Sequence, residues 1–440
     1  MARPKKEVSE ETPKKKKSKA DLVREVATAL NKEHARTGGR ATVCTGTDLK
    51  PRARIPTGIL TLDHFMGGGF PRGCHSMFWG PEGAGKTTLC LKTIASIQQR
   101  DSDAVVVFID GSSRLKTMLD YVAALGVDLT RFFLIEGESI EHAMDVVRKL
   151  ARQGLIDICI VDDLAVASTV KERWEKAGKG AERGIDSQSM AVQAHANSHF
   201  IRVMTPIFSR EEIACIYTQQ ARANLTPMSM EEYTLTGGHM LKHILSLCML
   251  LTRGASAEAP TTDSKVPTKD NRCGFALRTK MTKMSVDGAQ FTGSVAITQW
   301  VDGKTIEPGR DAYMFLYKNG LVTSSGAWKR LSSELFPKLE EAAKSFNTTL
   351  AALGITEDIS FQSRADMENF LAHDSVYTLV YNALVPNIHL QTNSNKKDLS
   401  AVQATIENPG EVEEDLVGIE ESIVNQTFEN SREDDEDGSN

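Results

Sequence analysis

Short apolar runs alternate along residues 54–251 with segments whose apolar residues recur at helical spacing. The apolar runs predict strands at 77–79, 104–109, 132–135, 156–161, 213–217 and 245–251. The clearest helix lies between two of these strands, begins after Ser139 as its N-cap and stops at Gly154. Strands that alternate with helices indicate an α/β fold with crossover helices.

An amphipathic helix precedes this region. Ser18 and Asp21 form a capping-box pattern. The apolar residues that follow on one helical face are Leu22, Val23, Val26 and Leu30. This face requires a docking partner, which is either the helix's own domain or a neighbouring subunit.

Composition divides the chain into five parts. Residues 1–18 almost lack apolar side chains, which predicts disorder. At the other end the chain turns polar and then acidic. The predicted parts are a basic disordered tail at 1–18, an N-terminal helix and linker at 19–53, an α/β core at 54–305, a small α+β C-terminal domain at 306–390 and an acidic disordered tail at 391–440.

Charge is distributed unevenly. The 440 residues carry a net charge of −6, but residues 1–20 carry +5 and residues 407–440 carry −12, which leaves the body near neutral. The run Lys14–Lys17 is either a contact for nucleic acid, a nuclear address or an ordinary solvated tail.

The apolar content is that of a soluble protein. No apolar run approaches the roughly 20 residues that a membrane helix needs, so no membrane association is expected. The seven cysteines form no C-x-x-C pair, and most lie in apolar stretches, which predicts reduced thiols. These features together predict a cytoplasmic protein.

The strongest chemical motif follows the predicted strand at 77–79. It fits G-x-x-x-x-G-K-[ST], the phosphate-binding loop, whose glycines let backbone N–H groups turn toward phosphate oxygens. Lys86 would supply a cation to the β- and γ-phosphates, and the Thr87 hydroxyl would ligate Mg²⁺. The predicted triphosphate site consists of Gly80, Pro81, Glu82, Gly83, Ala84, Gly85, Lys86, Thr87 and Thr88.

A second motif supports this prediction. The apolar run that begins at Ile158 ends in Asp162 and Asp163, the form expected of a strand whose terminal acid holds Mg²⁺. Asp162 is the preferred metal residue because it directly follows the apolar run.

Five stretches make the sequence similar to RecA-type recombinases, in particular to bacterial RecA and phage UvsX-like members. The stretches are Ile55-Pro-Thr-Gly-Ile-Leu-Thr-Leu-Asp63, the phosphate loop, Leu125-Gly-Val-Asp128 with the segment to Asp162, Ile216-Tyr-Thr-Gln-Gln-Ala-Arg222 with Leu235-Thr-Gly-Gly238, and Lys318-Asn-Gly-Leu-Val with Gly326-Ala-Trp328. The resemblance covers about residues 20–335. It implies a RecA-like ATPase core that uses ATP and Mg²⁺, with residues 19–53 serving polymerisation.

The resemblance also implies roles at the nucleotide. Gln220 would sense the γ-phosphate and act in catalysis together with Lys86, and Asp110 is a candidate third catalytic residue because the family's glutamate is missing here. Tyr121 would stack on adenine, and a buried core tyrosine is the alternative. The residues that would reach the ATP of the adjacent subunit are Lys280 and Lys283, and those in the same interface are Lys242 and His243.

Two interruptions of the α/β pattern, at 171–184 and 223–238, follow strand ends, where such sheets place ligand loops. The resemblance identifies them with DNA-binding loops. Contacts of the first loop would be Lys171, Arg173, Lys179 and Arg183, and those of the second would be Arg222, Leu225, Met228, Met230, Gly237 and Gly238. Expected partners are single- and double-stranded DNA, further copies of this chain, and single-strand-binding and mediator proteins.

One position departs from the family pattern. The family has a glutamate that activates water two residues after the aspartate equivalent to Asp110, and this chain has Ser112 there. No acid lies between Asp110 and Asp120. Either Asp110 or Asp163 substitutes for the glutamate, or hydrolysis is slow, because losing a general base costs about 10²–10⁴ in rate.

The sequence therefore predicts a DNA-dependent ATPase that forms a helical filament on single-stranded DNA and exchanges strands with a homologous duplex. Two alternatives stay open. One is a DNA-coating filament that binds ATP and barely hydrolyses it, and the other is a hexameric DNA motor with the same core.

Overall fold

The computed structural model describes residues 18–36, 43–136, 139–164, 190–224, 232–235, 238–257, 274–287, 294–300 and 306–391. The chain divides into two units, residues 1–52 and 53–440. In the first unit, α1 (Lys19–Arg36) follows the capping box predicted at Ser18 and Asp21, whose side chains and backbone N–H groups bond reciprocally. A short 3₁₀ turn, Gly46–Asp48, comes after it.

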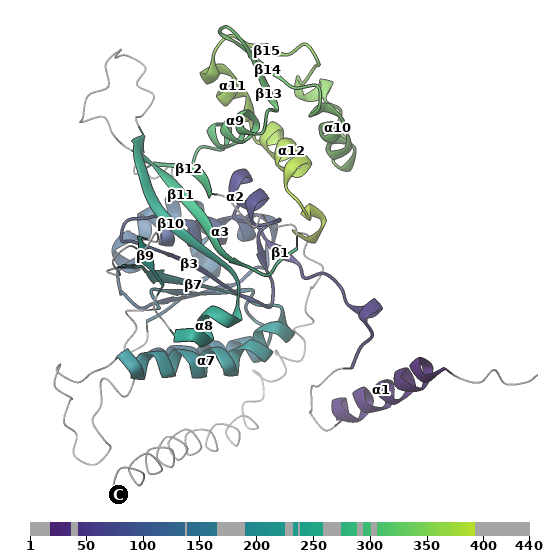
Figure 1. The fold of residues 1–440 in the computed structure, drawn as a ribbon, viewed down its shortest axis with the longest axis vertical. Coiled ribbons are helices and arrows are strands. Elements are labelled where there is room, and N and C mark those ends of the chain that lie inside the picture. Colours follow the sequence, from purple (N-terminus) through teal and green to yellow (C-terminus); the bar gives the residue numbers. More distant parts are fainter. Residues whose placement is uncertain are drawn as a thin grey trace, which may run out of the picture. The chain divides into compact units, whose positions relative to one another are not determined.

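The second unit is built on one eight-stranded sheet with the order β12-β11-β10-β3-β7-β6-β4-β5. Figure 1 labels β12, β11, β10, β3 and β7 of this sheet. The six strands from β10 to β5 are parallel, and β11 and β12 pair antiparallel at one edge. The strands are β3 (His75–Gly80), β4 (Val106–Asp110), β5 (Phe132–Ile135), β6 (Ile158–Asp162), β7 (Ala214–Gln220), β10 (Leu245–Ala257), β11 (Gly274–Met284) and β12 (Ser294–Trp300). All six strands predicted from the apolar runs are confirmed. The prediction at 132–135 matches β5 at both ends, and the other five differ at one or both ends.

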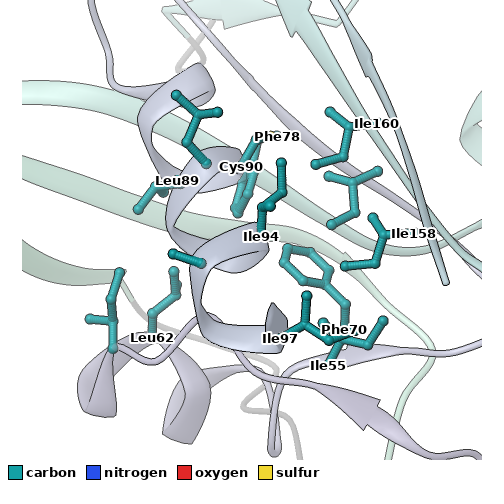
Figure 2. Close-up of a cluster of buried hydrophobic side chains, with 14 of the residues drawn as sticks. Ile55, Leu62, Phe70, Phe78, Leu89, Cys90, Ile94, Ile97, Ile158 and Ile160 are labelled. Atoms are coloured by element: carbon teal, nitrogen blue, oxygen red, sulfur yellow. The ribbon is translucent and has the colours of Figure 1, made fainter. Parts of the chain in front are cut away.

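Helices cover both faces of this sheet. One apolar cluster joins one sheet face to α3 (Lys86–Arg100) and α4 (Leu119–Ala124). Figure 2 shows Leu89 and Ile94 of α3 near Phe78 and Ile158 of the strands. A second cluster joins the other face to α5 (Ile140–Arg152), α7 (Met190–Glu211) and α8 (Gly238–Ile244). Helices on both faces of a mostly parallel sheet confirm the predicted α/β class.

The predicted cap of α5 is also confirmed. The Ser139 hydroxyl accepts a hydrogen bond from the His142 backbone N–H at 3.3 Å, and the helix ends at Arg152, two residues before Gly154. Nowhere in the described ranges is a helix both long and apolar enough to cross a bilayer.

A smaller set of elements follows the sheet and packs around a third apolar cluster. It contains a three-stranded sheet and four helices (Figure 1). Its elements are α9 (Pro308–Lys318), β13 (Val322–Ser325), β14 (Trp328–Leu331), α10 (Phe336–Ser345), β15 (Ser360–Phe361), α11 (Arg364–Leu371) and α12 (Asp374–Leu384). We call this set the C-terminal domain.

The C-terminal domain caps a helix of the core. The short helix α2 (Leu60–Phe65) follows β1 (Arg54–Ile55), which pairs with β2 (Phe70–Pro71), and its N-cap side chain makes no capping bond. Instead, the backbone N–H of Leu60 donates to the Tyr377 hydroxyl at 3.0 Å, and that of Thr61 donates to Asp311 Oδ2 at 3.1 Å. Two of the N–H groups that begin α2 are therefore satisfied by residues more than 200 positions away.

Asp63, which lies on α2, strengthens the same contact between α2 and the C-terminal domain. We call this contact the joint. Its side chain is fully buried and accepts hydrogen bonds from the backbone N–H groups of Thr57 and Gly58 at 2.8 and 2.9 Å. The hydroxyls of Thr57 and Tyr381 donate to it at 2.9 and 2.6 Å. Both carboxylate oxygens are thus occupied, and one donor comes from the C-terminal domain.

Candidate nucleotide-binding site

The phosphate loop connects β3 to α3, as its motif predicts. At Gly80 a Cβ would lie 2.0 Å from the carbonyl oxygen of Leu251 on β10, so only glycine fits there. Gly83 and Gly85 have φ of +71° and +78°, in the left-handed region that glycine adopts readily. A Cβ at Gly83 would meet no atom within 4 Å, so this part of the loop faces open space.

The Lys86 side chain folds back over the start of the loop. Its Nζ donates to the carbonyl oxygens of Gly80 and Pro81, each at 2.9 Å. Burial lowers the pKa of the Lys86 ammonium, while the charges of Asp163 and Asp162 raise it. A desolvated ammonium at this position is suited to attract phosphate oxygens.

Asp162, the last residue of β6, accepts hydrogen bonds from two hydroxyls. Thr87 Oγ1 donates to its Oδ2 at 2.6 Å, and Thr218 Oγ1 on β7 donates to its Oδ1. Burial raises the pKa of Asp162, and the two hydroxyls lower it. The two predicted metal residues, Thr87 and Asp162, are therefore in direct contact.

This pair fits Mg²⁺. Within the described ranges no group of three or more His, Cys, Asp or Glu residues is arranged to hold a metal. Mg²⁺ commonly needs only one or two protein oxygen ligands, because substrate phosphates and water complete its octahedron. A buried carboxylate whose ionised form is disfavoured, with a hydroxyl at 2.6 Å, provides such a partial set.

Sequence reasoning missed Thr218. The predicted strand stopped at Tyr217, whereas β7 continues to Gln220. Strand alternation puts Thr218 and Gln220 on the same face of β7, so a polar residue two positions before the sensor was an available signal.

Gln220 lies beside the phosphate loop. It is the strand partner of Gly80, and the next backbone N–H, that of Ala221, donates to the Gly80 carbonyl at 2.9 Å. Because β7 lies between β3 and β6, the residue predicted to sense the γ-phosphate sits between the phosphate loop and the metal residue. Its predicted role stays a prediction.

A two-stranded hairpin begins at Arg222, one residue beyond Ala221, which follows Gln220. In it β8 (Arg222–Ala223) pairs antiparallel with β9 (Tyr233–Thr234). The hairpin forms the base of the second predicted DNA loop. The predicted contacts Leu225, Met228, Met230 and Gly237 lie outside the described residues, and Gly238 begins α8.

The strand end at Asp110 is shaped by that residue's own carboxylate. Asp110 Oδ1 accepts from the backbone N–H and the hydroxyl of Ser112 at 3.0 and 2.8 Å, and Oδ2 accepts from the Leu115 N–H at 2.7 Å. Asp110 thus organises the turn in which Ser112 stands at the position of the expected glutamate. Arg114, within this turn, forms an ion pair with Glu82 of the phosphate loop.

Tyr121 lies against the first turn of α3. Its hydroxyl is 2.9 Å from the Thr88 hydroxyl, and its ring packs against the apolar cluster beside α3. The contact brings Tyr121 to the phosphate-loop helix, as expected for a residue near the nucleotide. Stacking on adenine stays a prediction.

Comparison with known proteins agrees with this geometry. The family model for the RecA N-terminal domain matches residues 24–286, more than half of the chain. This chain belongs to the RecA family. Protein RecA of Acholeplasma laidlawii is 31% identical over 293 residues, which cover 66% of this chain and 81% of that protein. Protein RecA of Methylobacterium sp. is 30% identical over 297 residues, covering 66% and 74%.

Membership of the RecA family does not test the four residues predicted to lie between subunits, so their roles stay predictions. These residues are Lys242, His243, Lys280 and Lys283. Lys283 Nζ donates to the carbonyl oxygens of Lys242 and His243 at 2.6 and 2.5 Å, so it caps the C-terminus of α8 within its own subunit. Burial lowers the pKa of Lys283. Lys280 lies on the same strand with an exposed side chain.

The first predicted DNA loop lies in a part of the chain that the structure does not describe. Its four predicted contacts, Lys171, Arg173, Lys179 and Arg183, fall outside the described residues. So do Lys14–Lys17 and the two predicted disordered tails, apart from the positions at their inner ends.

Proposed function

We propose that this chain is an ATP-dependent homologous recombinase. It assembles on single-stranded DNA as a helical filament with ATP between subunits, and it exchanges the bound strand with a homologous duplex. One observation carries the proposal. On β7, Gln220 pairs with the first residue of the phosphate loop, and Arg222 then begins the hairpin that leads to the second DNA segment.

The nucleotide is held by the chain's own residues. The glycine-rich backbone and Lys86 bind the phosphates, and Thr87 with Asp162 would hold Mg²⁺. When bound, Mg²⁺ neutralises negative charge on the β- and γ-phosphate oxygens. Thr218 orients Asp162 through its hydroxyl.

In this proposal Asp163 is the general base that activates the attacking water. Asp110 is the other candidate, but both of its oxygens accept hydrogen bonds from the turn it organises. Asp163 is buried next to Asp162, and its charge acts on Lys86, so it lies within the site. A carboxylate placed this way can accept a proton from water at neutral pH, whereas the Ser112 hydroxyl cannot without help.

DNA binding depends on the nucleotide through β7. A shift of Gln220 toward or away from the γ-phosphate moves the β8–β9 hairpin, because only Ala221 separates the two strands. Arg222 contacts DNA phosphate, so binding is largely sequence-independent and weakens as salt rises.

Assembly is supported by α1. Its apolar residues Leu22, Val23, Val26 and Leu30 have exposed fractions from 39% to 62%. A row of apolar side chains on one helical face is normally buried against a partner surface. We propose that this partner is another copy of the chain.

The test is ATP turnover with and without single-stranded DNA. Phosphate release should rise on adding DNA, and Lys86→Ala should abolish both the basal and the stimulated rate. DNA retention should be higher with ATP than with ADP or without nucleotide. Equal retention in all three states would contradict the proposal, because the nucleotide would then not control the DNA loops.

The DNA-coating alternative is favoured by one observation, the engaged Asp110 in a turn that lacks the family's glutamate. It predicts ATP-dependent DNA retention with a turnover rate equal to that of Lys86→Ala. The motor alternative predicts closed rings rather than open filaments in electron micrographs taken with ATP and single-stranded DNA.

A further inference from the structure

The turn after β4 places a positively charged side chain, that of Arg114, beside the phosphate loop. Arg114 Nη1 lies 3.5 Å from Glu82 Oε1, and the two side chains are 68% and 76% exposed. Ion pairs this exposed contribute little to stability, so Arg114 can exchange Glu82 for another anion at low cost.

The direction of the Lys86 side chain identifies which end of a triphosphate would lie nearby. The lysine of a phosphate loop contacts the β- and γ-phosphates. Here its Nζ lies on the carbonyl oxygens of Gly80 and Pro81, the two residues that precede Glu82. The γ-phosphate end therefore faces the part of the loop to which Arg114 is paired.

The backbone around Arg114 is held in place. Asp110 accepts hydrogen bonds from Ser112 on one side of Arg114 and from Leu115 on the other. Asp110 is also the strand partner of Asp162, so the turn leaves the sheet beside the predicted metal position. A long, exposed guanidinium thus extends from a fixed base next to the site.

We propose that Arg114 is a γ-phosphate contact supplied by the same subunit. On ATP binding its guanidinium leaves Glu82 and donates two hydrogen bonds to γ-phosphate oxygens. A planar guanidinium matches the spacing of two phosphate oxygens, and it stabilises the charge that develops during phosphoryl transfer. Because ADP lacks the γ-phosphate, Arg114 selects ATP over ADP. The inference rests on the ATP site proposed above.

The experiment compares ATP and ADP affinities of full-length variants with Mg²⁺, using a non-hydrolysable ATP analogue and ADP as competitors of a fluorescent nucleotide. Arg114→Gln should weaken the ATP analogue about 10- to 100-fold, the range of a charge-assisted hydrogen bond, and ADP by less than about twofold. Arg114→Lys should restore part of the loss, since it keeps the charge but not the paired donors.

Lys116→Gln is the matched control. Lys116 lies two residues further on and is 65% exposed, but it pairs with Glu136 rather than with the phosphate loop. The substitution removes the same charge from the same turn and should leave both affinities unchanged. Glu82→Gln releases Arg114 without deleting it, and it should tighten the ATP analogue relative to ADP.

An ATP-to-ADP affinity ratio of Arg114→Gln equal to that of the wild type would overturn the inference and leave the ATP site intact. A loss of equal size in Lys116→Gln would also overturn it, because the effect would then come from net charge alone. If the wild type binds the ATP analogue no better than Lys86→Ala, the proposed function itself fails.

Discussion

Asp63 at the joint with the C-terminal domain and Asp162 at the nucleotide site are both buried carboxylates. They differ in the kind of group that donates hydrogen bonds to them. Their exposed fractions are 0% and 9%, and burial raises the pKa of each. Asp63 accepts two backbone N–H groups and two hydroxyls. The donors that the structure describes for Asp162 are the hydroxyls of Thr87 and Thr218.

The difference separates a carboxylate with a structural role from one that can bind a cation. Backbone N–H groups are fixed by the fold, so Asp63 cannot exchange its partners without unfolding the segment that leads into α2, which contains Thr57 and Gly58. Hydroxyls rotate about a single bond and also accept, so Thr87 can turn its oxygen to a cation that approaches Asp162. Asp162 is therefore suited to binding and Asp63 to stability.

The largest expected effect is on activity at Asp162. Asp162→Asn should lower Mg²⁺-dependent ATP turnover by at least about 10²-fold, because the metal loses a charged ligand at the developing phosphate charge. The unfolding free energy should stay equal or rise slightly, since the buried charged form is disfavoured in the fold. Turnover assays and urea unfolding measure both quantities. A large loss of stability would contradict the comparison.

The opposite outcome is expected at Asp63. Asp63→Ala should lower the unfolding free energy by about 3–5 kcal/mol, because several buried donors lose their acceptor. Turnover per folded molecule should stay near the wild-type value. Tyr381→Phe, which removes one donor, should cost about 1–2 kcal/mol. Urea unfolding of both variants checks this order, and a Tyr381→Phe effect as large as that of Asp63→Ala would contradict it.

The smallest effect concerns pH at Asp311, the other carboxylate of the joint. Burial raises the pKa of Asp311 from 3.8 to about 6. A raised pKa means that the folded state favours the protonated form. The stability contributed by Asp311 is therefore complete below about pH 4 and lost as the pH rises to about 6.

Asp311→Asn keeps an oxygen that can accept from Thr61 and cannot ionise. Its unfolding free energy relative to the wild type should thus grow between about pH 4 and about pH 6.5 and then level off, at about 1–3 kcal/mol. Urea unfolding of both proteins across this range gives the difference. A constant difference would show that Asp311 does not titrate in this window.

The sequence was sufficient where a contact is local or periodic. The phosphate loop is a continuous motif, and its strand and helix follow from apolar spacing. Asp162 could be predicted because parallel strands bring their carboxyl ends to one edge, and Asp162 ends the apolar run. The strand order that puts Gln220 between Gly80 and Asp162 was not predicted, because apolar spacing marks each strand but not its neighbours in the sheet.

Other contacts could not be predicted because they join residues far apart in the chain. Lys283 reaches carbonyl groups 40 and 41 positions away, and Tyr381 reaches Asp63 across 318 positions. The pair of Arg114 with Glu82 depends on how the Asp110 turn folds, which no periodic pattern encodes. Side-chain chemistry at such positions is visible in sequence, but the partner is set by tertiary packing.

The cap that the C-terminal domain supplies to α2 also bears on how the protein is made. Leu60 and Thr61 leave the ribosome hundreds of residues before Tyr377 and Asp311, at about 5–20 residues per second. The backbone N–H groups of Leu60 and Thr61 therefore lack these acceptors for tens of seconds after their synthesis. Chains cut short before residue 306 never gain the acceptors, so experiments that dissect this protein should keep the segment through Gln391.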